Sequence, residues 1–460
     1  MKLKGNVYFK NQLSGQIQKK EEDTFEFQYK DNSTEVSWTL PYKSEPYASE
    51  NIFPFFDGLI PEGWLLNLVH KNWKIPKNDR MTLLLTTCMD CIGAAHIAPE
   101  EATTIADFAT KDSPHQIKNT TKKSIDSYSN IIKNEKFEPH QIQKLSSDRC
   151  LICLMDLTEQ ENQYHSHCAR ELFGFNEVPK VDVSLNDLEA LALIQINQRL
   201  TLTGVQKKLS LSESKENKHH RLTIVGMDGK FILKPPTSEY PEIAEIEHVS
   251  MKLAQLQKIK MARCGLIYLD SGERAYITRR FDRADKEKIQ MEDFCQLSEK
   301  LTEKKYSGSS EALAKVIDKY SDQAPDDKLT LFQILLFSFW IGNADMHLKN
   351  FSLWKDPHSG NVRMSPGYDF LCTRLLISTK EDPEEMALPI NGKKNKLQWQ
   401  DFVALGMSYK IPLKVIERVR EQMLDSFFDA EDLIARSFLT DAKKEEFMDL
   451  LRERSKRLSK

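Results

Sequence analysis

The stretch Ile341-Gly-Asn-Ala-Asp-Met-His-Leu-Lys-Asn-Phe351 is the one around which the rest of the chain can be interpreted. It follows a strongly apolar run, Leu329 to Ile341, and it brings an acid, an imidazole, an ammonium and an amide together. Asp and Asn at close spacing most often form turns, because their short polar side chains hydrogen-bond to the nearby backbone. The stretch therefore indicates a functional loop only if the other parts of a site lie in the right order around it.

Size and composition limit the possible classes of protein. The 460 residues are enough for two or three domains, and 40% hydrophobic with 29% charged residues is typical of a soluble globular protein. A net charge of −3 predicts that any contact with DNA is made only indirectly, through a partner. No apolar run reaches the roughly 18 residues that a membrane span needs, and the first residues are too polar for a secretory signal. The eight cysteines fit reduced thiols or a metal site better than a disulfide framework, so we expect a cytoplasmic protein.

The first third of the chain predicts a small domain and a linker. In residues 1–99, the alternating segments 4–9 and 24–29 predict strands, and a helix is expected after Trp64. Cys88 and Cys91 have apolar neighbours, so we interpret them as core cysteines rather than metal ligands. Residues 100–148 are rich in Lys, Ser, Thr, Asn and Gln, which is typical of a polar linker.

Residues 149–175 form a short segment that we call the Cys/His cassette. It contains Cys150, Cys153, His165 and Cys168, and three thiolates with one imidazole suit a tetrahedral zinc ion. His167 is a competing ligand, although its place next to Cys168 would strain the chelate. The alternative is a small hydrophobic turn without metal.

From residue 176 onward, signals of phosphoryl transfer accumulate. Residues 200–211 alternate like a hairpin that turns at Gly204, and glycine lets the backbone approach phosphate oxygens closely. Lys234 ends a short apolar strand, and Glu247 lies on the next predicted helix, where a lysine-pairing carboxylate would be expected. Residues 275–283 predict a strand that runs into a charged hinge. Alone, each signal has an ordinary structural explanation, such as a turn, an edge-strand lysine or a surface glutamate.

The order of these parts is the order found in protein kinases. Asp345 and Asn350 have the spacing of a kinase catalytic loop, and Asp369 precedes Phe370 as in the kinase metal-binding motif, although Leu371 replaces its glycine. Asp345 would deprotonate a Ser or Thr hydroxyl, and Asn350 and Asp369 are hard oxygen ligands for Mg²⁺. His347 is expected to face the γ-phosphate of ATP, and the alternative is a structural hydrogen bond inside the loop. We therefore predict an α+β, two-lobed protein-kinase-like fold, with a mixed α/β N-lobe at 176–283, an all-helical C-lobe at 284–460 and the small α/β domain in front.

Several motifs together resemble the HipA-type serine/threonine kinase toxins: Gly-Val-Gln-Lys-Lys at 204–208, Ile-Leu-Lys-Pro-Pro at 232–236, Arg-Phe-Asp-Arg at 280–283 and Gly-Asn-Ala-Asp-Met-His-Leu-Lys-Asn at 342–350. The segment from Phe56 to Trp64 is similar to the small N-terminal domain of that family, which also occurs as a separate HipS protein. The resemblance implies a kinase that uses ATP and Mg²⁺, phosphorylates a protein such as an aminoacyl-tRNA synthetase, and thereby arrests translation and growth. It also implies a DNA-binding antitoxin of the HipB type and autophosphorylation in the glycine-turn loop.

The resemblance also implies roles for individual residues. Asp345 would be the catalytic base, and Thr201 or Thr203 would be autophosphorylated. Glu247 would pair with the strand lysine. Nucleotide contacts would come from the following residues: Thr203, Gly204, Val205, Gln206, Lys207, Lys208, Lys234, Arg279, Arg280, Phe281, Asp282, His347, Asn350, Tyr368 and Asp369.

Two other functions remain compatible with the sequence. A degenerate kinase fold could serve as a non-catalytic scaffold or regulator, although the presence of Lys234, Asp345, Asn350 and Asp369 argues against it. A phosphotransferase that acts on a small molecule or lipid would need the same catalytic residues, because a fold does not identify its substrate.

Overall fold

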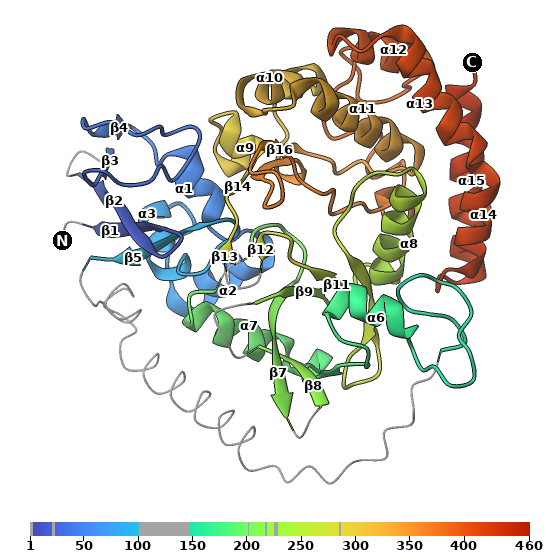
Figure 1. Ribbon diagram of the computed structural model, residues 1–460, viewed down its shortest axis with the longest axis horizontal. Helices are drawn as coiled ribbons and strands as arrows, with labels where there is room; N and C mark the ends of the chain where they lie inside the picture. Colours follow the sequence, from blue (N-terminus) through green and yellow to red (C-terminus); the bar gives the residue numbers. More distant parts are fainter. Residues whose placement is uncertain are drawn as a thin grey trace.

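The computed structural model describes most of the chain, namely residues 3–20, 24–100, 147–200, 202–216, 219–224, 229–284 and 287–460. The linker expected at 100–148 lies almost wholly outside these ranges, and so does Thr201. None of the helices within them combines the length and the apolar character that crossing a membrane requires. Figure 1 shows three parts: an N-terminal unit in blue, a region around a sheet in green and a mainly helical region in orange and red.

The N-terminal unit is an antiparallel sheet with helices. In β1 (Lys4–Phe9) every second residue is buried, as expected for a strand with one face on a core. The strand order is β4-β3-β2-β1-β5. The expected strands and the helix after Trp64 are present, and the other elements are β2 (Gln12–Lys19), β3 (Phe25–Tyr29), β4 (Tyr47–Ser49), β5 (Ala95–Pro99), α1 (Pro54–Leu59), α2 (Gly63–Trp73) and α3 (Arg80–Thr87).

A second, six-stranded sheet carries the predicted lysine strand, with the order β10-β11-β9-β7-β8-β6. All its pairs are antiparallel except β6 with β8. Its elements are β6 (Lys180–Val181), β7 (Leu209–Glu216), β8 (His219–Thr223), β9 (Phe231–Lys234), β10 (Cys264–Tyr268) and β11 (Arg274–Arg279). The helices around it are α6 (Ser166–Phe173), the 3-10 turn η1 (Leu185–Asp187), α7 (Leu188–Asn197) and α8 (Ile243–Leu256).

Among the described residues of the range 200–211, the expected hairpin is not formed. β7 begins only at Leu209 and pairs with β8 and β9. Leu200 instead forms an isolated parallel bridge with Asp90 of the N-terminal unit. Gly204 has φ +101°, in the left-handed region that favours glycine, so the segment makes a tight turn without a ladder of its own.

The C-terminal region is organised around α11 (Ala324–Trp340). Pro325 and two aspartates lie in its first turn, where proline has no N–H to lose and acids interact favourably with the helix dipole. Its last turns are apolar on all sides, and Phe337, Phe339 and Trp340 are fully buried. The apolar run from Leu329 therefore forms a central core helix that delivers the chain to the Asp345 loop.

The prediction of an all-helical C-lobe was wrong in one respect. A three-stranded sheet, β14-β15-β16, lies within it and consists of β14 (Met291–Asp293), β15 (Ser352–Lys355) and β16 (Val362–Met364). β15 begins two residues after Asn350, and β16 ends five residues before Asp369. The sheet thus fixes the chain on both sides of the expected site. A small hairpin of β12 (Arg283–Ala284) and β13 (Glu287–Lys288) precedes it.

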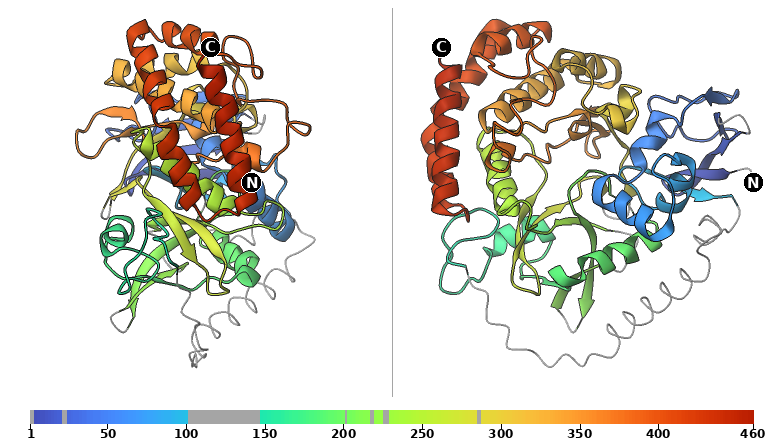
Figure 2. Two further views of the ribbon diagram at one scale, coloured as in Figure 1. Left: turned by 90° about the vertical axis from the view of Figure 1, so that its right-hand side faces the viewer. Right: turned by 180° about the vertical axis from the view of Figure 1, so that it is seen from behind.

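The remaining elements of this region are helical. They are α9 (Phe294–Leu297), η2 (Thr302–Lys304), α10 (Ser310–Tyr320), η3 (Leu348–Asn350), η4 (Thr373–Leu375), α12 (Trp399–Ser408), α13 (Leu413–Asp425), α14 (Phe427–Arg436) and α15 (Asp441–Leu458). The N-terminal unit contacts both other parts, because α1 packs against α9 and α2 packs against α7. Figure 2 shows the same arrangement from the side and from behind.

Candidate active site

Side-chain hydrogen bonds fix the loop after α11. The Asn343 side-chain oxygen accepts from the backbone N–H of Asp345 at 3.1 Å, and the Asn350 amide group donates to the Asp345 carbonyl at 2.8 Å. This second bond uses the NH₂ group of Asn350 and leaves its side-chain oxygen to act as a ligand. The Asp345 side chain is exposed, and the Tyr306 hydroxyl donates to its carboxylate at 2.7 Å. The loop therefore presents one acid outward and one amide oxygen nearby.

Lys234 lies between two carboxylates. Its Nζ is 2.5 Å from Oε1 of Glu247 and 2.5 Å from Oδ1 of Asp369, and both Lys234 and Glu247 are buried. Asp369 keeps 34% of its side chain exposed. The sequence led us to expect the pairing with Glu247, and the structure adds the contact with Asp369.

The pKa values in this group follow from burial and from the charges. Burial opposes the charge of Lys234, but the carboxylates of Asp369 and Glu247 outweigh it and hold the pKa of Lys234 above its ordinary value. Burial raises the pKa of Glu247 to about 7, although Lys234 acts in the opposite direction. For Asp369, Lys234 and Lys208 overcome the effect of burial and lower the pKa to about 2. Asp369 is therefore the carboxylate that stays ionised at neutral pH.

The Gly204 turn brings a second lysine to the same place. Nζ of Lys208 donates to the carbonyl of Thr203 at 2.8 Å, and burial lowers the pKa of this lysine. A Cβ atom on Gly204 would lie 2.5 Å from that Nζ, so a side chain there would collide with Lys208. Thr203 and Gly204 therefore curve closely around a buried positive charge.

Val205 and Lys207, in the predicted glycine-turn loop, make contacts with Trp64 of the N-terminal unit. Val205 is 60% exposed, and its carbonyl accepts from the backbone N–H of Trp64 at 3.5 Å. Nζ of Lys207 lies 5.8 Å from the centre of the Trp64 ring. Thr203, Gly204 and Lys208 line a cavity, whereas Val205, Gln206 and Lys207 do not.

One cavity connects these elements. Its wall includes Gly58, Leu59, Glu62 and Ile92 from the N-terminal unit, together with most of the predicted nucleotide-binding residues: Thr203, Gly204, Lys208, Lys234, Arg279, Arg280, Phe281, Asp282, His347, Asn350, Tyr368 and Asp369. Asp345 is not part of the wall. Its backbone carbonyl accepts a hydrogen bond from Asn350, and Asn350 does line the cavity. Thr203, one candidate for autophosphorylation, lines the cavity, whereas Thr201 lies outside the described residues.

The hinge residues also make contacts that the sequence did not predict. The Arg280 guanidinium binds the Asp282 carboxylate at 2.7 Å, and Arg283 binds the same carboxylate at 2.6 Å. Asp282 also accepts from the backbone N–H of Gly93, and Arg283 binds Asp90 at 2.9 Å. These charged groups hold the N-terminal unit to the sheet. The charged ends of Arg280 and Asp282 thus have protein partners while both residues line the cavity, and their nucleotide contact stays a prediction.

His347 lies in the wall of the cavity. Its ring is buried and meets the Tyr306 ring edge-on, with 4.9 Å between ring centres. Burial lowers the pKa of His347, although the Asp345 charge acts against this, so the imidazole is neutral at pH 7. Its Nδ1 makes no hydrogen bond within the described part of the chain.

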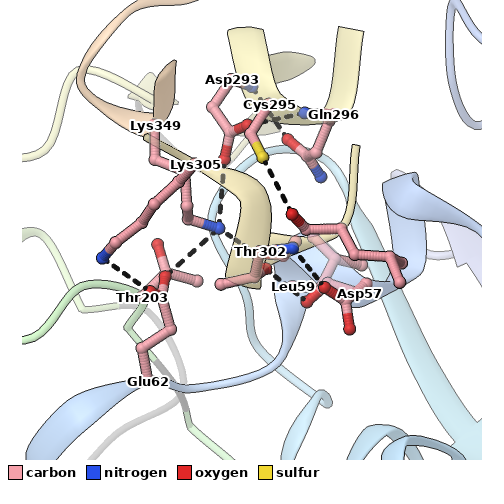
Figure 3. Close-up of polar contacts among 12 residues, drawn as sticks. Asp57, Leu59, Glu62, Thr203, Asp293, Cys295, Gln296, Thr302, Lys305 and Lys349 are labelled. Carbon is pink, nitrogen blue, oxygen red and sulfur yellow. Dashed lines mark hydrogen bonds and ion pairs between the residues drawn. The ribbon is translucent and has the colours of Figure 1, made fainter. Parts of the chain in front are cut away.

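Sequence reasoning missed the contacts that close the cavity from the N-terminal side (Figure 3). Glu62 lies between Lys305, at 3.1 Å, and Lys349, at 3.3 Å. Lys349 also lies 3.3 Å from Asp293 and donates to the carbonyl of Gly58 at 3.2 Å. Lys349 belongs to the Asp345 loop and lines the cavity, and its ammonium group binds Glu62 of the N-terminal unit and Asp293 of β14. The motif contained this lysine, but nothing in its spacing indicated the partner.

Two hydrogen bonds reinforce the same contact. The Asp57 carboxylate accepts from the backbone N–H of Thr302 at 2.8 Å, and the Gln296 side chain donates to the carbonyl of Phe55 at 2.9 Å. Gly58 has no room for a side chain, because a Cβ would lie 2.5 Å from the Gln296 side chain. Helix α1 is thus fitted closely to α9 and η2.

The four predicted zinc ligands come together away from the cavity. The donor atoms of Cys150, Cys153, His165 and Cys168 all lie within 4.8 Å of one another. Cys88, in contrast, is a buried core residue whose thiol donates to the carbonyl of Leu59, and Cys91 is equally buried. The geometry therefore agrees with Cys88 and Cys91 as core residues, and with Cys150 and Cys153 as members of a group of possible metal ligands.

The residues of the cavity fit a nucleoside triphosphate with Mg²⁺. Lys208 and Lys234 provide positive charge at one end, and the side-chain oxygens of Asn350 and Asp369 are hard ligands of the type that Mg²⁺ prefers. The tight Gly204 turn offers backbone groups to a phosphate, and the imidazole of His347 lies in the same wall. The wall of one cavity thus contains both the positive groups for the phosphates and the oxygen ligands for the metal ion.

Comparison with known families gives two matches that together cover most of the chain. A model described as HipA-like C-terminal domain matches residues 200–428, and one described as HipA N-terminal domain matches residues 5–98. The second range coincides with the blue unit of Figure 1.

Comparison with individual proteins agrees with these matches. A provisionally named kinase from Haemophilus influenzae is 25% identical over 272 residues, which are 53% of this chain and 78% of that protein. Y4mE of Sinorhizobium fredii, also a kinase only by provisional name, is 25% identical over 447 residues, 92% of this chain and 90% of the relative. Among solved structures, HipA from a complex with HipB and operator DNA of Shewanella oneidensis MR-1 has a TM-score of 0.65 at 16% identity, covering 98% and 97% of the two chains. At this identity the likeness shows a common fold.

Proposed function

Because the chain belongs to the HipA family and has its kinase-like fold, we propose that it is an ATP-dependent serine/threonine protein kinase and the toxin of a toxin–antitoxin system. The observation that carries the proposal is the position of Lys234. It binds Glu247 on one side and the partly exposed Asp369 on the other, in a cavity that also contains the Gly204 turn and Asn350. This is the set of groups that phosphoryl transfer requires.

The residues of the cavity have distinct roles in this proposal. ATP with Mg²⁺, when bound, supplies the γ-phosphoryl group. Asn350 and Asp369 hold the metal ion, and Lys208, Lys234 and the backbone at Thr203–Gly204 hold the phosphates. Glu247 keeps Lys234 in place through its buried contact. His347, a neutral imidazole in the wall of the cavity, donates or accepts a hydrogen bond at the phosphate end when nucleotide is bound.

Asp345 is the proposed catalytic base. Its carboxylate is exposed, so a hydroxyl group can reach it, and proton acceptance by such a group contributes about 10²- to 10⁴-fold to a rate. The hydroxyl of Tyr306 orients it at 2.7 Å. An acid outside the wall of the cavity supports a protein substrate over a small molecule enclosed with the nucleotide. An aminoacyl-tRNA synthetase is the substrate that we propose to test first.

Further parts of the proposal concern regulation. HipA of Shewanella oneidensis occurs in a complex with HipB and operator DNA, and we propose a HipB-type antitoxin for this chain, with DNA bound only through that partner. Autophosphorylation is placed at Thr203 or Thr201. The free cysteines fit the reducing cytoplasm as the compartment.

Asp345→Asn is the variant that tests the proposal, because it retains the shape of the side chain. Purified wild-type protein should consume ATP and acquire phosphate on Ser or Thr, as followed by phosphopeptide mass spectrometry. The variant should lose at least about 100-fold of this activity and still bind an ATP analogue with Mg²⁺. Expression of the wild type, but not of the variant, should arrest growth. Full ATP consumption by Asp345→Asn would reject Asp345 as the base, and nucleotide turnover without any phosphoprotein would reject the protein substrate.

A further inference from the structure

The Cys/His cassette forms a compact donor set that the proposed kinase function does not use. Cys150 and Cys168 are buried, and Cys153 and His165 are half-buried. Nδ1 of His165 lies 3.3 Å from Sγ of Cys153 and 3.8 Å from Sγ of Cys168. Of the residues that the structure describes, no other group of three or more His, Cys, Asp or Glu side chains has its donor atoms arranged in this way.

The backbone of the cassette is shaped to bring these donors together. The backbone N–H of Cys150 donates to the carbonyl of Met155 at 2.8 Å, and that of Leu154 donates to the carbonyl of Cys150 at 2.9 Å. Leu154 takes the left-handed conformation, φ +68°, to close this turn. His165 and Cys168 follow at the start of α6, where a spacing of three residues puts both side chains on one face. The turn and the helix start therefore each supply two donors.

The environment of His165 selects which ring nitrogen can bind a metal. Its Nε2 lies 3.0 Å from the carbonyl oxygen of Asp156, which can only accept, so Nε2 carries the proton. In the neutral ring this leaves the lone pair on Nδ1, the atom that faces the thiols. A carbonyl that holds the far nitrogen of a histidine in this way is a frequent feature of metal-binding sites.

The cassette is packed against the sheet that carries Lys234. In β10, the backbone N–H of Leu266 donates to the carbonyl of Leu151 at 2.8 Å, and its carbonyl accepts from the Tyr164 hydroxyl, also at 2.8 Å. The ring of His248, in α8, donates to the carbonyl of Ile152 at 3.0 Å. His248 directly follows Glu247, the carboxylate that binds Lys234. The turn between the first two cysteines thus contacts both the sheet and the helix that hold the lysine pair.

We propose that Cys150, Cys153, His165 and Cys168 bind one Zn²⁺ ion, and that this metal holds α8 and β10 in the position that pairs Glu247 with Lys234. Three thiolates and one imidazole are a soft donor set that suits tetrahedral zinc and is unsuited to Mg²⁺. Four protein ligands leave no open position, so the ion is structural and not catalytic. The metal site itself is independent of the kinase proposal, and only its effect on nucleotide binding rests on that proposal.

The metal site is tested first on the purified full-length protein. Elemental mass spectrometry of wild-type protein, produced with zinc in the medium and purified without chelator, should find about one zinc per chain. His165→Asn and Cys153→Ser should each lose most of it. His167→Asn is the comparison that separates the two histidines, because Nε2 of His167 also lies 3.3 Å from Sγ of Cys168, yet His167 is exposed and lies outside the donor set, so this variant should keep its zinc. Wild-type protein without zinc would overturn the site, and zinc lost from His167→Asn but kept by His165→Asn would overturn the donor set.

A second measurement does not depend on variants that fold. Zinc is removed from wild-type protein with a chelator and replaced by Co²⁺, whose absorption spectrum reports tetrahedral thiolate ligands. Intense tetrahedral bands that disappear when Zn²⁺ alone is added back support the site. A spectrum of octahedral, oxygen-bound cobalt would overturn it.

The effect on the lysine pair is measured as nucleotide affinity. Binding of an ATP analogue with Mg²⁺ should weaken about tenfold when zinc is removed and recover when zinc is returned. Glu247→Gln should bind the analogue weakly with or without zinc, because its lysine pair is already broken. Unchanged affinity of zinc-free, folded wild-type protein would overturn the link to α8. Wild-type protein that holds zinc but binds no nucleotide would reject the kinase proposal and leave the metal site standing.

Discussion

Two groups of lysines and carboxylates each contribute side chains to the wall of the same cavity, and they differ in how exposed their carboxylates are. In the first, Lys234 binds Glu247 and Asp369, and 34% of the Asp369 side chain is exposed. In the second, Glu62 binds Lys305 and Lys349, and the three side chains are 5–10% exposed. An open carboxylate can exchange its lysine for a metal ion, and the lysine can then bind phosphate. A closed group can only hold its elements together.

The comparison shows that charge and burial alone do not identify a catalytic group. Both clusters contain a lysine whose pKa lies above its ordinary value although burial opposes the charge, since carboxylates surround both Lys234 and Lys349. The second cluster joins the N-terminal unit to the Asp345 loop, whereas the first lies within the part matched by the C-terminal model. The exposure of the Asp369 carboxylate is what distinguishes the proposed catalytic group around Lys234 from the structural group around Glu62.

Lys234→Met should have the largest effect, a loss of about 10³-fold in phosphoryl transfer with weak nucleotide binding, because the charge that faces the phosphates is removed. ATP consumption and titration with an ATP analogue measure both. Lys71→Met is the control, since Lys71 forms an exposed pair with Glu189 at 2.9 Å, and it should keep wild-type values. Activity of Lys234→Met within threefold of wild type would break the distinction between the two groups.

Glu62→Gln should act mainly on stability. The two lysines would lose their shared carboxylate in a buried place, and breaking such a pair costs about 3 kcal/mol. Denaturant unfolding measures this loss of stability. For Glu62→Gln, the loss in free energy of unfolding should be larger than the loss in free energy of nucleotide binding. For Lys234→Met, the loss in binding should be the larger of the two. Glu189→Gln, in the exposed pair, should cost less than about 1 kcal/mol. Equal costs for Glu62→Gln and Glu189→Gln would contradict the structural role.

Glu292 is a third buried carboxylate, and it joins the N-terminal unit to the C-terminal region without a lysine partner. It accepts from the Ser37 hydroxyl at 2.7 Å and from the backbone N–H of Trp38 at 2.8 Å. Burial raises its pKa from 4.5 to about 7. Between pH 4.5 and pH 7 the folded protein binds more protons at Glu292 than the unfolded chain does. The stabilising contribution of Glu292 to the free energy of unfolding is therefore complete below pH 4.5 and is lost as the pH rises through 7.

The measurement for Glu292 is the free energy of unfolding between pH 5 and pH 7. Glu292→Gln should reduce the fall in stability over this range by about 2 kcal/mol, at about 1.4 kcal/mol per pKa unit. Glu247, whose pKa is also about 7, titrates in both proteins and cancels in the difference. Identical pH slopes for the two proteins would show that Glu292 does not titrate in this range.

Much of the candidate site could be predicted, because its parts follow one another in a fixed order and each has local support. The apolar run from Leu329 becomes α11, and the helix that carries Glu247 starts shortly after the Lys234 strand. The N-terminal strands were recognisable by their alternation. The contacts that were missed join residues far apart in the sequence. Glu62 and Lys305 are 243 residues apart, and no local pattern connects them.

Three features were decided by tertiary contacts. The C-lobe contains β14, β15 and β16 because Ser352–Lys355 finds partners on both sides, which its own composition does not reveal. Arg280 and Asp282 turn to each other and to the N-terminal unit. Lys349 reaches from its loop to Glu62 and Asp293.

The sequence by itself determined which chemical groups the protein has and where they stand along the chain: the strand lysine, the acid and amide of the Asp345 loop, and the four donors of the Cys/His cassette. Helix and strand periodicity and motif spacing are local properties, so they can be read without a fold. Only the tertiary structure decided which charged groups are closed and which stay open. That depends on packing between distant segments, because burial and access belong to the folded surface and not to any one stretch of residues.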